Sequence, residues 1–202
     1  MTAVGLPVLV RLHLISRRVP ATVMALVACG AVLRGALEWH WVKGSGNAAL
    51  QFPTLFEAGT AAAIAVTTYG PFGEPERATG RWLPWLRLGT ALLLTGVAIA
   101  VLAAGAAAAN LPGGTLALAR NVAGATGIGL LAAAVVGGAL AWIGPMTYVV
   151  VAEVALSQSW TSPWTWPARP PHDRGAAICA AAVFVAGITI TAVRGCRDSL
   201  SD

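Results

Sequence analysis

The sequence predicts an all-α polytopic membrane protein, with six transmembrane helices and an N-terminal amphipathic helix at the membrane surface. Of the 202 residues, 57% are hydrophobic and only 10% are charged, whereas a soluble domain typically has about 25% charged residues. The mean hydropathy is +0.73. Several apolar stretches also reach the length of about 20 residues that a helix needs to cross a bilayer. We therefore expect residues 1–202 to form a single transmembrane domain in the cell membrane.

The first 18 residues are expected to form the amphipathic helix, because Arg11 and His13 interrupt a run of leucine, valine and isoleucine. An extended basic tail is the alternative interpretation. The first span is expected at about 19–41, where tryptophans beside His40 are typical of the membrane interface. The second span is expected at about 50–70, and Pro53 is tolerated because it falls in the first helical turn.

A third span is expected at about 88–109, ahead of a turn rich in proline and glycine. The next apolar region, Thr115–Leu156, contains 42 residues. A single helix of that length would measure about 63 Å, roughly twice the hydrocarbon thickness. Gly137-Gly138 and Gly144-Pro145 offer places to break it, so we predict a hairpin of spans at about 116–136 and 139–156. The last span is expected at about 175–193.

Basic residues near the ends of the spans predict a cytoplasmic N-terminus and a cytoplasmic C-terminus. In the six-span arrangement eight arginines lie inside, namely Arg11, Arg17, Arg18, Arg77, Arg81, Arg87, Arg194 and Arg197. The outside then holds Lys43, Arg120, Arg169 and Arg174. A five-span arrangement gives the same ratio of eight to four, so the length of the 115–156 region is what favours six spans.

Ionisable residues within apolar stretches are the strongest functional signal, because an unpaired charge in hydrocarbon costs several kcal/mol. In the six-span arrangement five of them fall in the outer half of the membrane: Arg34, Glu38, Glu57, Arg120 and Glu153. Either they line a substrate path, or they have a structural role. In the structural alternative Arg34 pairs with Glu57 or Glu38 and locks the helices together, while Glu153 snorkels outward. A proton relay through the carboxylates is a further variant of the first interpretation.

The residues give no support for an enzyme, a metal site or a nucleic-acid-binding protein. The net charge of +5 comes from arginines at the ends of apolar blocks, which orient a membrane protein rather than form a binding stripe. Cys29, Cys179 and Cys196 are too scattered for a disulfide framework or a thiolate metal site. There is no phosphate-binding P-loop and no hydrolase motif, and the single pair His172-Asp173 is weak evidence for catalysis.

The segment between the second and third spans carries both signs of charge and is followed by Trp82 and Trp85. This pattern suits the docking of a soluble partner; a solvated loop with interfacial tryptophans is the alternative. The charged and turn residues of this candidate coupling segment are Glu74, Glu76, Arg77, Gly80 and Arg81.

This arrangement resembles the permease subunits of type-2 ABC exporters. Glu76-Arg77-Ala78-Thr79-Gly80 matches the Glu-Arg-x-x-Gly-like sequence that they often carry in the coupling helix between spans 2 and 3. Trp160–Pro171 is similar in position to their short helices that dip into the outer leaflet before span 6. The chain is short for that family, and its fourth and fifth spans are joined by an unusually tight, uncharged turn.

The resemblance implies a homodimer that works with a soluble ATP-binding subunit. ATP and Mg²⁺ would then be bound by that partner, and this chain would need no cofactor of its own. Glu74–Arg81 would receive the movement of the ATPase, and the substrate would leave between the two permeases. The alternative is a non-transporting membrane scaffold or accessory subunit of a larger complex, whose charges are structural pairs and whose other contacts are with membrane lipid.

Overall fold

The computed structural model describes residues 11, 14–38, 48–67, 83–107, 114–160 and 162–194, with the backbone alone at 48–51. Six α-helices form the bundle within these ranges: α2 (Val19–Glu38), α3 (Ala48–Val66), α5 (Leu83–Ala106), α6 (Gly114–Val136), α7 (Ile143–Ser157) and α8 (Arg174–Arg194). Two short 3-10 helices, η2 (Gly138–Leu140) and η3 (Trp166–Ala168), precede α7 and α8. The described part of the chain contains no strand.

Within the described ranges, five segments are long and apolar enough to cross a membrane: Val19–Glu38, Leu83–Ala106, Gly114–Val136, Gly138–Ser157 and Arg174–Arg194. The expectation of an all-α, multi-pass membrane fold is therefore confirmed. In α3 the apolar helix with described side chains is shorter, Phe52–Val66, so the count of six spans stays a prediction. The N-terminal amphipathic helix also stays a prediction, because most of residues 1–13 lie outside the described ranges.

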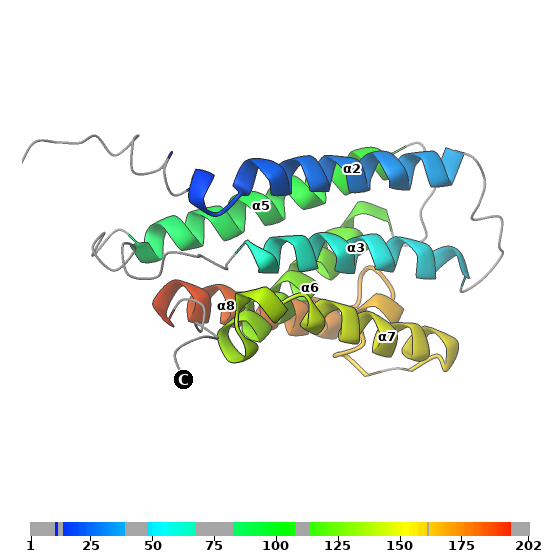
Figure 1. Ribbon diagram of the computed structural model, residues 1–202. Coiled ribbons are helices and arrows are strands. Elements are labelled where there is room, and N and C mark those ends of the chain that lie inside the picture. The colour runs from blue at the N-terminus through cyan, green and yellow to red at the C-terminus, as the bar shows by residue number, and fades with distance from the viewer. Residues whose placement is uncertain are drawn as a thin grey trace, which may run out of the picture.

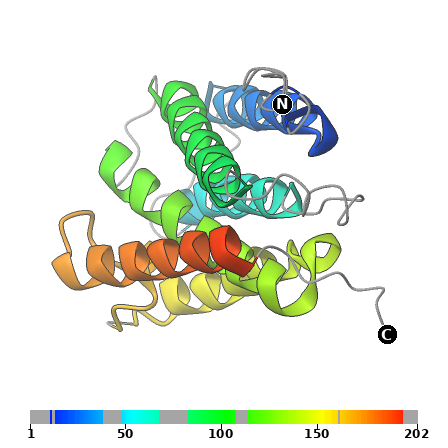
Figure 2. The same cartoon turned by 90° about the vertical axis from the view of Figure 1, so that its left-hand side faces the viewer.

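Successive helices run in alternating directions along the bundle, as the colour sequence in Figure 1 shows. At one end, called here the proximal end, α2, α5 and α7 begin and α3, α6 and α8 end. At the opposite, distal end, α3, α6 and α8 begin. The views in Figures 1 and 2 show α2 and α5 on one side of α3, and α7 and α8 on the other.

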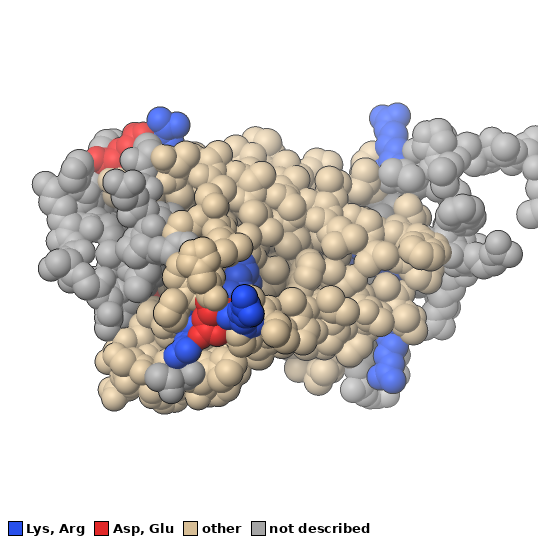
Figure 3. Space-filling model, turned by 180° about the vertical axis from the view of Figure 1, so that it is seen from behind, with Lys and Arg blue, Asp and Glu red and all other residues tan. Residues whose placement is uncertain are grey.

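Helix α6 is the centre of the bundle. It packs against α3, α5, α7 and α8, and 56% of its apolar window is buried inside the protein, the highest share among the candidate spans. Charged side chains gather toward the two ends of the face shown in Figure 3, with a band of uncharged side chains between them. This distribution is typical of a protein whose middle is surrounded by lipid tails.

The region 115–156 is divided at Gly137, which has a φ of 91°. A residue with a Cβ rarely adopts such a backbone conformation, whereas glycine does so readily. Helix α6 therefore ends at Val136, and after η2 the chain returns as α7. Gly144 lies so close to α6 that a Cβ at this position would be 2.8 Å from the Cβ of Ala132. The hairpin is tight because small residues form its inner face.

Two helix crossings depend on pairs of glycines. A Cβ at Gly187 in α8 would lie 2.6 Å from the carbonyl oxygen of Gly127 in α6, and a Cβ at Gly105 in α5 would lie 2.6 Å from the carbonyl oxygen of Gly30 in α2. Apolar side chains gain little from leaving lipid for another apolar surface, so helices in a bilayer associate largely through close packing. These glycines let the two helix backbones approach closely enough for such packing.

We predict that Gly127→Val and Gly187→Val each lower the thermal stability of the purified protein in detergent. The new side chain would overlap the backbone of the facing helix, and overpacking of this kind typically costs about 1–3 kcal/mol. Gly96→Val in α5 is the matched control, because a Cβ at Gly96 meets nothing within 4 Å. The unfolding temperature of each variant measures the effect. An equal decrease in all three variants would show that the loss of stability does not come from the close approach of α6 and α8.

Candidate functional site

Arg120, in the second turn of α6, is buried, with 8% of its surface exposed. Its guanidinium donates hydrogen bonds to the carbonyl oxygens of Pro170 (2.8 Å), Trp166 (2.6 Å) and Arg169 (3.1 Å). These carbonyls belong to η3 and the turn after it. Two of them also accept a backbone N–H: Trp166 from Arg169, and Pro170 from Asp173. Arg120 therefore attaches the segment between α7 and α8, residues 158–173, to the distal end of α6.

Asn121 links Arg120 to an acidic side chain on α3. Its Oδ1 accepts a hydrogen bond from Nε of Arg120 at 3.3 Å, and its side chain is also hydrogen-bonded to the carboxyl group of Glu57. Asn121 and Glu57 are each 6% exposed, and Glu57 feels the positive charge of Arg120. The buried acid and the buried base are thus joined through one amide, which satisfies polar groups on both α3 and α6.

A second polar contact joins α3 to α7. The hydroxyl of Thr54 donates a hydrogen bond to Oε1 of Glu153 at 2.6 Å. Thr54 precedes Glu57 by three residues, so both project from one face of α3. This face of α3 contacts α6 through Glu57 and α7 through Thr54. We call the set Thr54, Glu57, Arg120, Asn121 and Glu153 the distal polar cluster.

Aromatic side chains cover the cluster on the side of residues 158–173. The hydroxyl of Tyr148 in α7 donates to the carbonyl oxygen of Trp164 at 2.8 Å, and the rings of Tyr148 and Trp166 lie 4.7 Å apart. Trp166 is 2% exposed and its ring edge rests on Gly124, where a Cβ would be only 2.6 Å away. The glycine makes room for the indole, which places η3 inside the bundle.

The space left inside the distal polar cluster is small. Between Glu57, Asn121, Tyr148 and Trp166 lies a cavity of about 10 Å³, no more than a single water molecule requires. The cluster is therefore closed in this conformation. A substrate larger than water could enter only after α3, α7 or residues 158–173 moved away from α6.

The five charged residues expected in one tier are divided by the structure into two groups. Glu57, Arg120 and Glu153 belong to the distal polar cluster. Arg34 instead pairs with Glu38 on α2, with Nε and Oε1 2.6 Å apart and side-chain exposures of 60% and 48%. This pair lies on the outer face of α2, whereas the opposite face packs on α5 and α3. Of the alternatives for Arg34, the pairing with Glu38 is the one observed.

Residues of the candidate coupling segment lie outside the described part of the chain: Glu74, Glu76, Arg77, Gly80 and Arg81. The structure does describe the two helices that this segment joins. Helix α3 ends at Val66 and α5 begins at Leu83, both at the proximal end of the bundle. The assignment of the segment as a docking site for a partner stays a prediction.

Sequence reasoning missed four members of the site: Thr54, Asn121, Tyr148 and Trp166. Asn121 could have been found, because it follows Arg120 inside an apolar stretch, where any strongly polar side chain needs a partner. Thr54 carries a weaker signal, since threonine commonly bonds to its own helix. Trp166 belongs to the segment compared with short helices that dip into the outer leaflet, and nothing in its spacing indicated burial.

His172 and Asp173, noted as a pair in the sequence, have different environments. His172 is exposed. Asp173 accepts a hydrogen bond from the backbone N–H of Ala176 at 3.0 Å and forms an ion pair with Arg169. Asp173 is therefore the N-cap of α8, which explains this acid without a catalytic role.

Comparisons of the chain with protein-family models, with curated proteins and with solved structures found no match.

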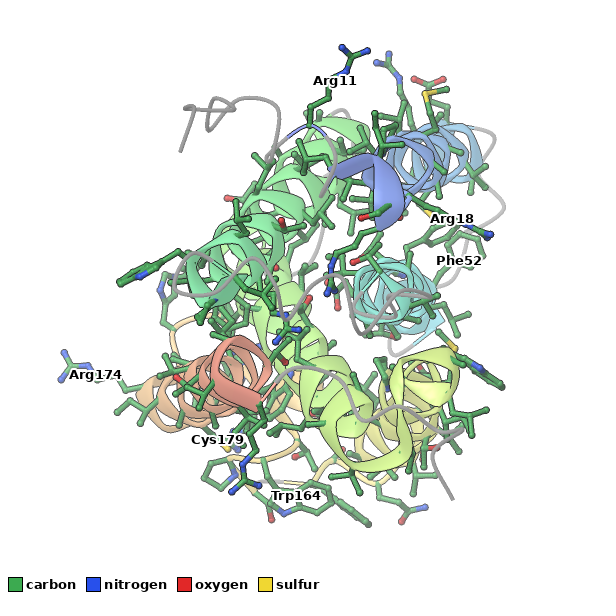
Figure 4. The ribbon with its side chains drawn as sticks, turned by 60° about the vertical axis from the view of Figure 1, so that its left-hand side comes forward. Arg11, Arg18, Phe52, Trp164, Arg174 and Cys179 are labelled. Atoms are coloured by element: carbon green, nitrogen blue, oxygen red, sulfur yellow. The ribbon has the colours of Figure 1, made fainter. Side chains whose placement is uncertain are left out.

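We predict that Arg120→Gln loosens residues 162–173 from the bundle. Hydrogen bonds from a charged donor contribute about 1.5–3 kcal/mol each, and Arg120 makes three of them to this segment. Hydrogen–deuterium exchange in the segment should become faster, while exchange at the proximal end of α6 stays slow. Arg174→Gln is the control, since Arg174 points away from the bundle (Figure 4). If hydrogen–deuterium exchange in residues 162–173 is unchanged in Arg120→Gln, then Arg120 does not hold this segment on the bundle.

Because Asp173 caps α8 as an ionised carboxylate, we predict that its contribution to the stability of the protein depends on pH. The N–H of Ala176 and the Arg169 guanidinium lower the pKa of this carboxyl group below its ordinary value. An acid whose pKa is lower in the folded protein than in the unfolded chain stabilises the fold while it is ionised. This stabilisation is complete above the ordinary pKa of aspartate, about 4, and is lost as pH falls through the pKa of the folded state. The difference in unfolding temperature between wild type and Asp173→Asn should therefore be constant above about pH 5 and shrink at lower pH. A difference that does not change with pH would exclude the ionised cap.

Proposed function

We propose that this chain is the transmembrane permease subunit of an exporter that draws its energy from a separate ATP-binding subunit. The observation that carries the proposal is the distal polar cluster, which joins α3, α6 and α7 and is attached through Arg120 to the segment before α8. Polar groups inside a membrane bundle mark substrate and ion pathways more often than other positions do. In this proposal the cluster is the closed outer gate of the path.

The geometry of α3 provides a route for coupling. In the sequence, Glu74–Arg81 follows α3. Glu57 lies nine residues before the end of α3 at Val66, or roughly 14 Å along the helix axis. A rigid helix transmits a displacement over that distance. Movement of α3 relative to α6 would separate Glu57 from Asn121 and Thr54 from Glu153. Residues 158–173 would then be free to leave the path.

The proposed assembly is a homodimer with two ATP-binding subunits on the cytoplasmic side. Both termini are proposed to be cytoplasmic, in keeping with the excess of basic residues that the sequence predicts on that side of the membrane. ATP and Mg²⁺ belong to the partner in this proposal, and the chain itself is not an enzyme. Its outer surface contacts membrane lipid, and it has no role in binding nucleic acid.

A second candidate function is that of a membrane scaffold or accessory subunit. The closed state of the cluster favours it, because the cavity of about 10 Å³ has no room for a substrate. Arg120 also donates three hydrogen bonds to backbone carbonyls and one to Asn121. In this role Glu57, Asn121 and Arg120 lock the helices, and the exposed pair Arg34–Glu38 on α2 belongs to a contact with another subunit.

We predict that an ATPase co-purifies with the protein in mild detergent and that exchanging two charges, Glu76→Arg with Arg77→Glu, abolishes this association. The exchange leaves the net charge unchanged, so a loss of ATPase association would depend on the order of the two charges in this segment. The matched control is the exchange Arg197→Asp with Asp198→Arg near the C-terminus, which should not affect association. Retention of the ATPase after deletion of residues 74–81 would contradict the coupling segment, and absence of any ATPase would favour the scaffold.

A further inference from the structure

A groove lies between the start of α2 and the end of α3, away from the distal polar cluster. Its volume is about 480 Å³, within the range of roughly 300–1,000 Å³ that is usual for ligand sites. Alanines form its walls: Ala21 and Ala25 on α2, and Ala62 and Ala63 on α3. Because none of these side chains extends beyond a methyl group, the space between the helices stays unfilled.

The groove has an apolar interior and a basic end. From Arg18 to Ala25 it follows α2 for seven residues, or about 10 Å. Trp142, in the turn before α7, lines it as well and is 46% exposed. Tryptophan is favoured at the level of lipid headgroups, so this position suits the boundary between the hydrocarbon layer and water.

Arg17 and Arg18 form the basic end. Arg17 is 6% exposed, and its Nη1 donates to the carbonyl oxygen of Thr67, just after α3, at 3.4 Å. Arg18 is exposed and has a φ of 54°, a conformation uncommon for residues other than glycine. The resulting turn brings two consecutive arginines to one end of the groove, and Figure 4 shows Arg18 on the side of α2 that faces α3.

A third arginine adds to the positive charge of this region. Arg87 of α5 lines a small cavity of about 20 Å³ together with Arg17 and Thr67. Among the described residues that line the groove, two are arginines and none is acidic. A ligand that fits both parts of the groove must therefore be an amphiphile with an apolar chain and a negatively charged head.

We propose that this groove is a binding site for an anionic phospholipid. One acyl chain lies between the alanine faces of α2 and α3, and the phosphate group of the head is bound by the exposed Arg18, with the buried Arg17 adding positive charge beside it. Basic pockets between transmembrane helices recognise anionic headgroups in this way. The surrounding membrane supplies the lipid, and the site is independent of whether the protein transports a substrate.

The proposal is tested on the full chain purified in mild detergent. Native mass spectrometry measures how much phosphatidylglycerol or phosphatidylcholine stays bound, and thermal unfolding is followed with each lipid and with inorganic phosphate. We expect phosphatidylglycerol to be retained and to raise the unfolding temperature. Phosphatidylcholine should not be retained, and neither phosphatidylcholine nor inorganic phosphate should raise the unfolding temperature. Equal retention of both lipids would contradict charge recognition, and equal stabilisation by phosphate alone would reveal a free-anion site instead.

Two variants test the two parts of the groove. Arg18→Gln removes an exposed charge and should weaken phosphatidylglycerol binding about fivefold, the effect expected for one basic residue near anionic lipid. Ala63→Leu fills the apolar part without a change in charge and should also reduce retention. Arg11→Gln and Ala100→Leu, both at exposed positions outside the groove, are the matched controls.

The outcomes separate the lipid site from a purely structural role of these residues. Loss of retention in Arg18→Gln and Ala63→Leu, with both controls at the wild-type level and unfolding temperatures in lipid-free detergent unchanged, supports the site. Wild-type retention in both groove variants overturns it. Equal loss in Arg11→Gln also overturns it, since the attraction would then be a general effect of surface charge.

Discussion

The burial of Arg120 is the interaction on which the distal half of this bundle depends. A guanidinium cannot lose its charge in a protein, and neither lipid nor an apolar helix face offers it acceptors. Its hydrogen bonds must therefore come from nearby backbone and side-chain oxygens, and they come from Trp166, Arg169, Pro170 and Asn121. This requirement fixes the position of the segment between α7 and α8. It also fixes the position of the aromatic side chains that cover the cluster.

Close packing at glycine determines the rest of the bundle. Helix α6 bears Gly124 against Trp166, Gly127 against α8 and Gly129 against Ala65 of α3. Three neighbours thus approach one helix through three glycines within six residues. A central helix of this kind cannot shift along one neighbour without disturbing the others, because packed interfaces change between discrete arrangements rather than continuously. Coordinated movement of α3 and residues 158–173 is consequently easier to accommodate than a displacement of α6.

The sequence was sufficient to predict an all-α, multi-pass membrane fold. Long apolar stretches predicted the helices, and the excessive length of the 115–156 region predicted a break that the structure has at Gly137. Helix ends were less accurate: α5 begins at Leu83, ahead of the expected start at 88, because Pro84 suits a first helical turn and Trp85 and Arg87 can remain helical at the membrane surface. Composition identifies apolar length but not the residue at which a helix begins.

The site could be predicted only in part, because depth in the membrane says nothing of the direction in which a side chain points. Arg34 and Glu57 fall in the same half of the predicted bundle, yet Arg34 lies on the outer face of α2 and Glu57 faces α6. That difference depends on which helices are neighbours, a property of tertiary packing. Partners such as Thr54 for Glu153 are 99 residues apart in the chain, and no local pattern connects them.

The closed cluster sets a condition on either proposed role. Opening it requires Arg120 to give up three hydrogen bonds to carbonyls, each contributing about 1.5–3 kcal/mol because the donor is charged, together with the contacts of Thr54 and Asn121. A cost of that size keeps the closed arrangement predominant unless something binds the open arrangement more tightly. A weakly bound substrate cannot supply such a difference by itself. A transporter built on this cluster therefore needs an external source of energy applied to α3, whereas a scaffold benefits from the same cost as rigidity.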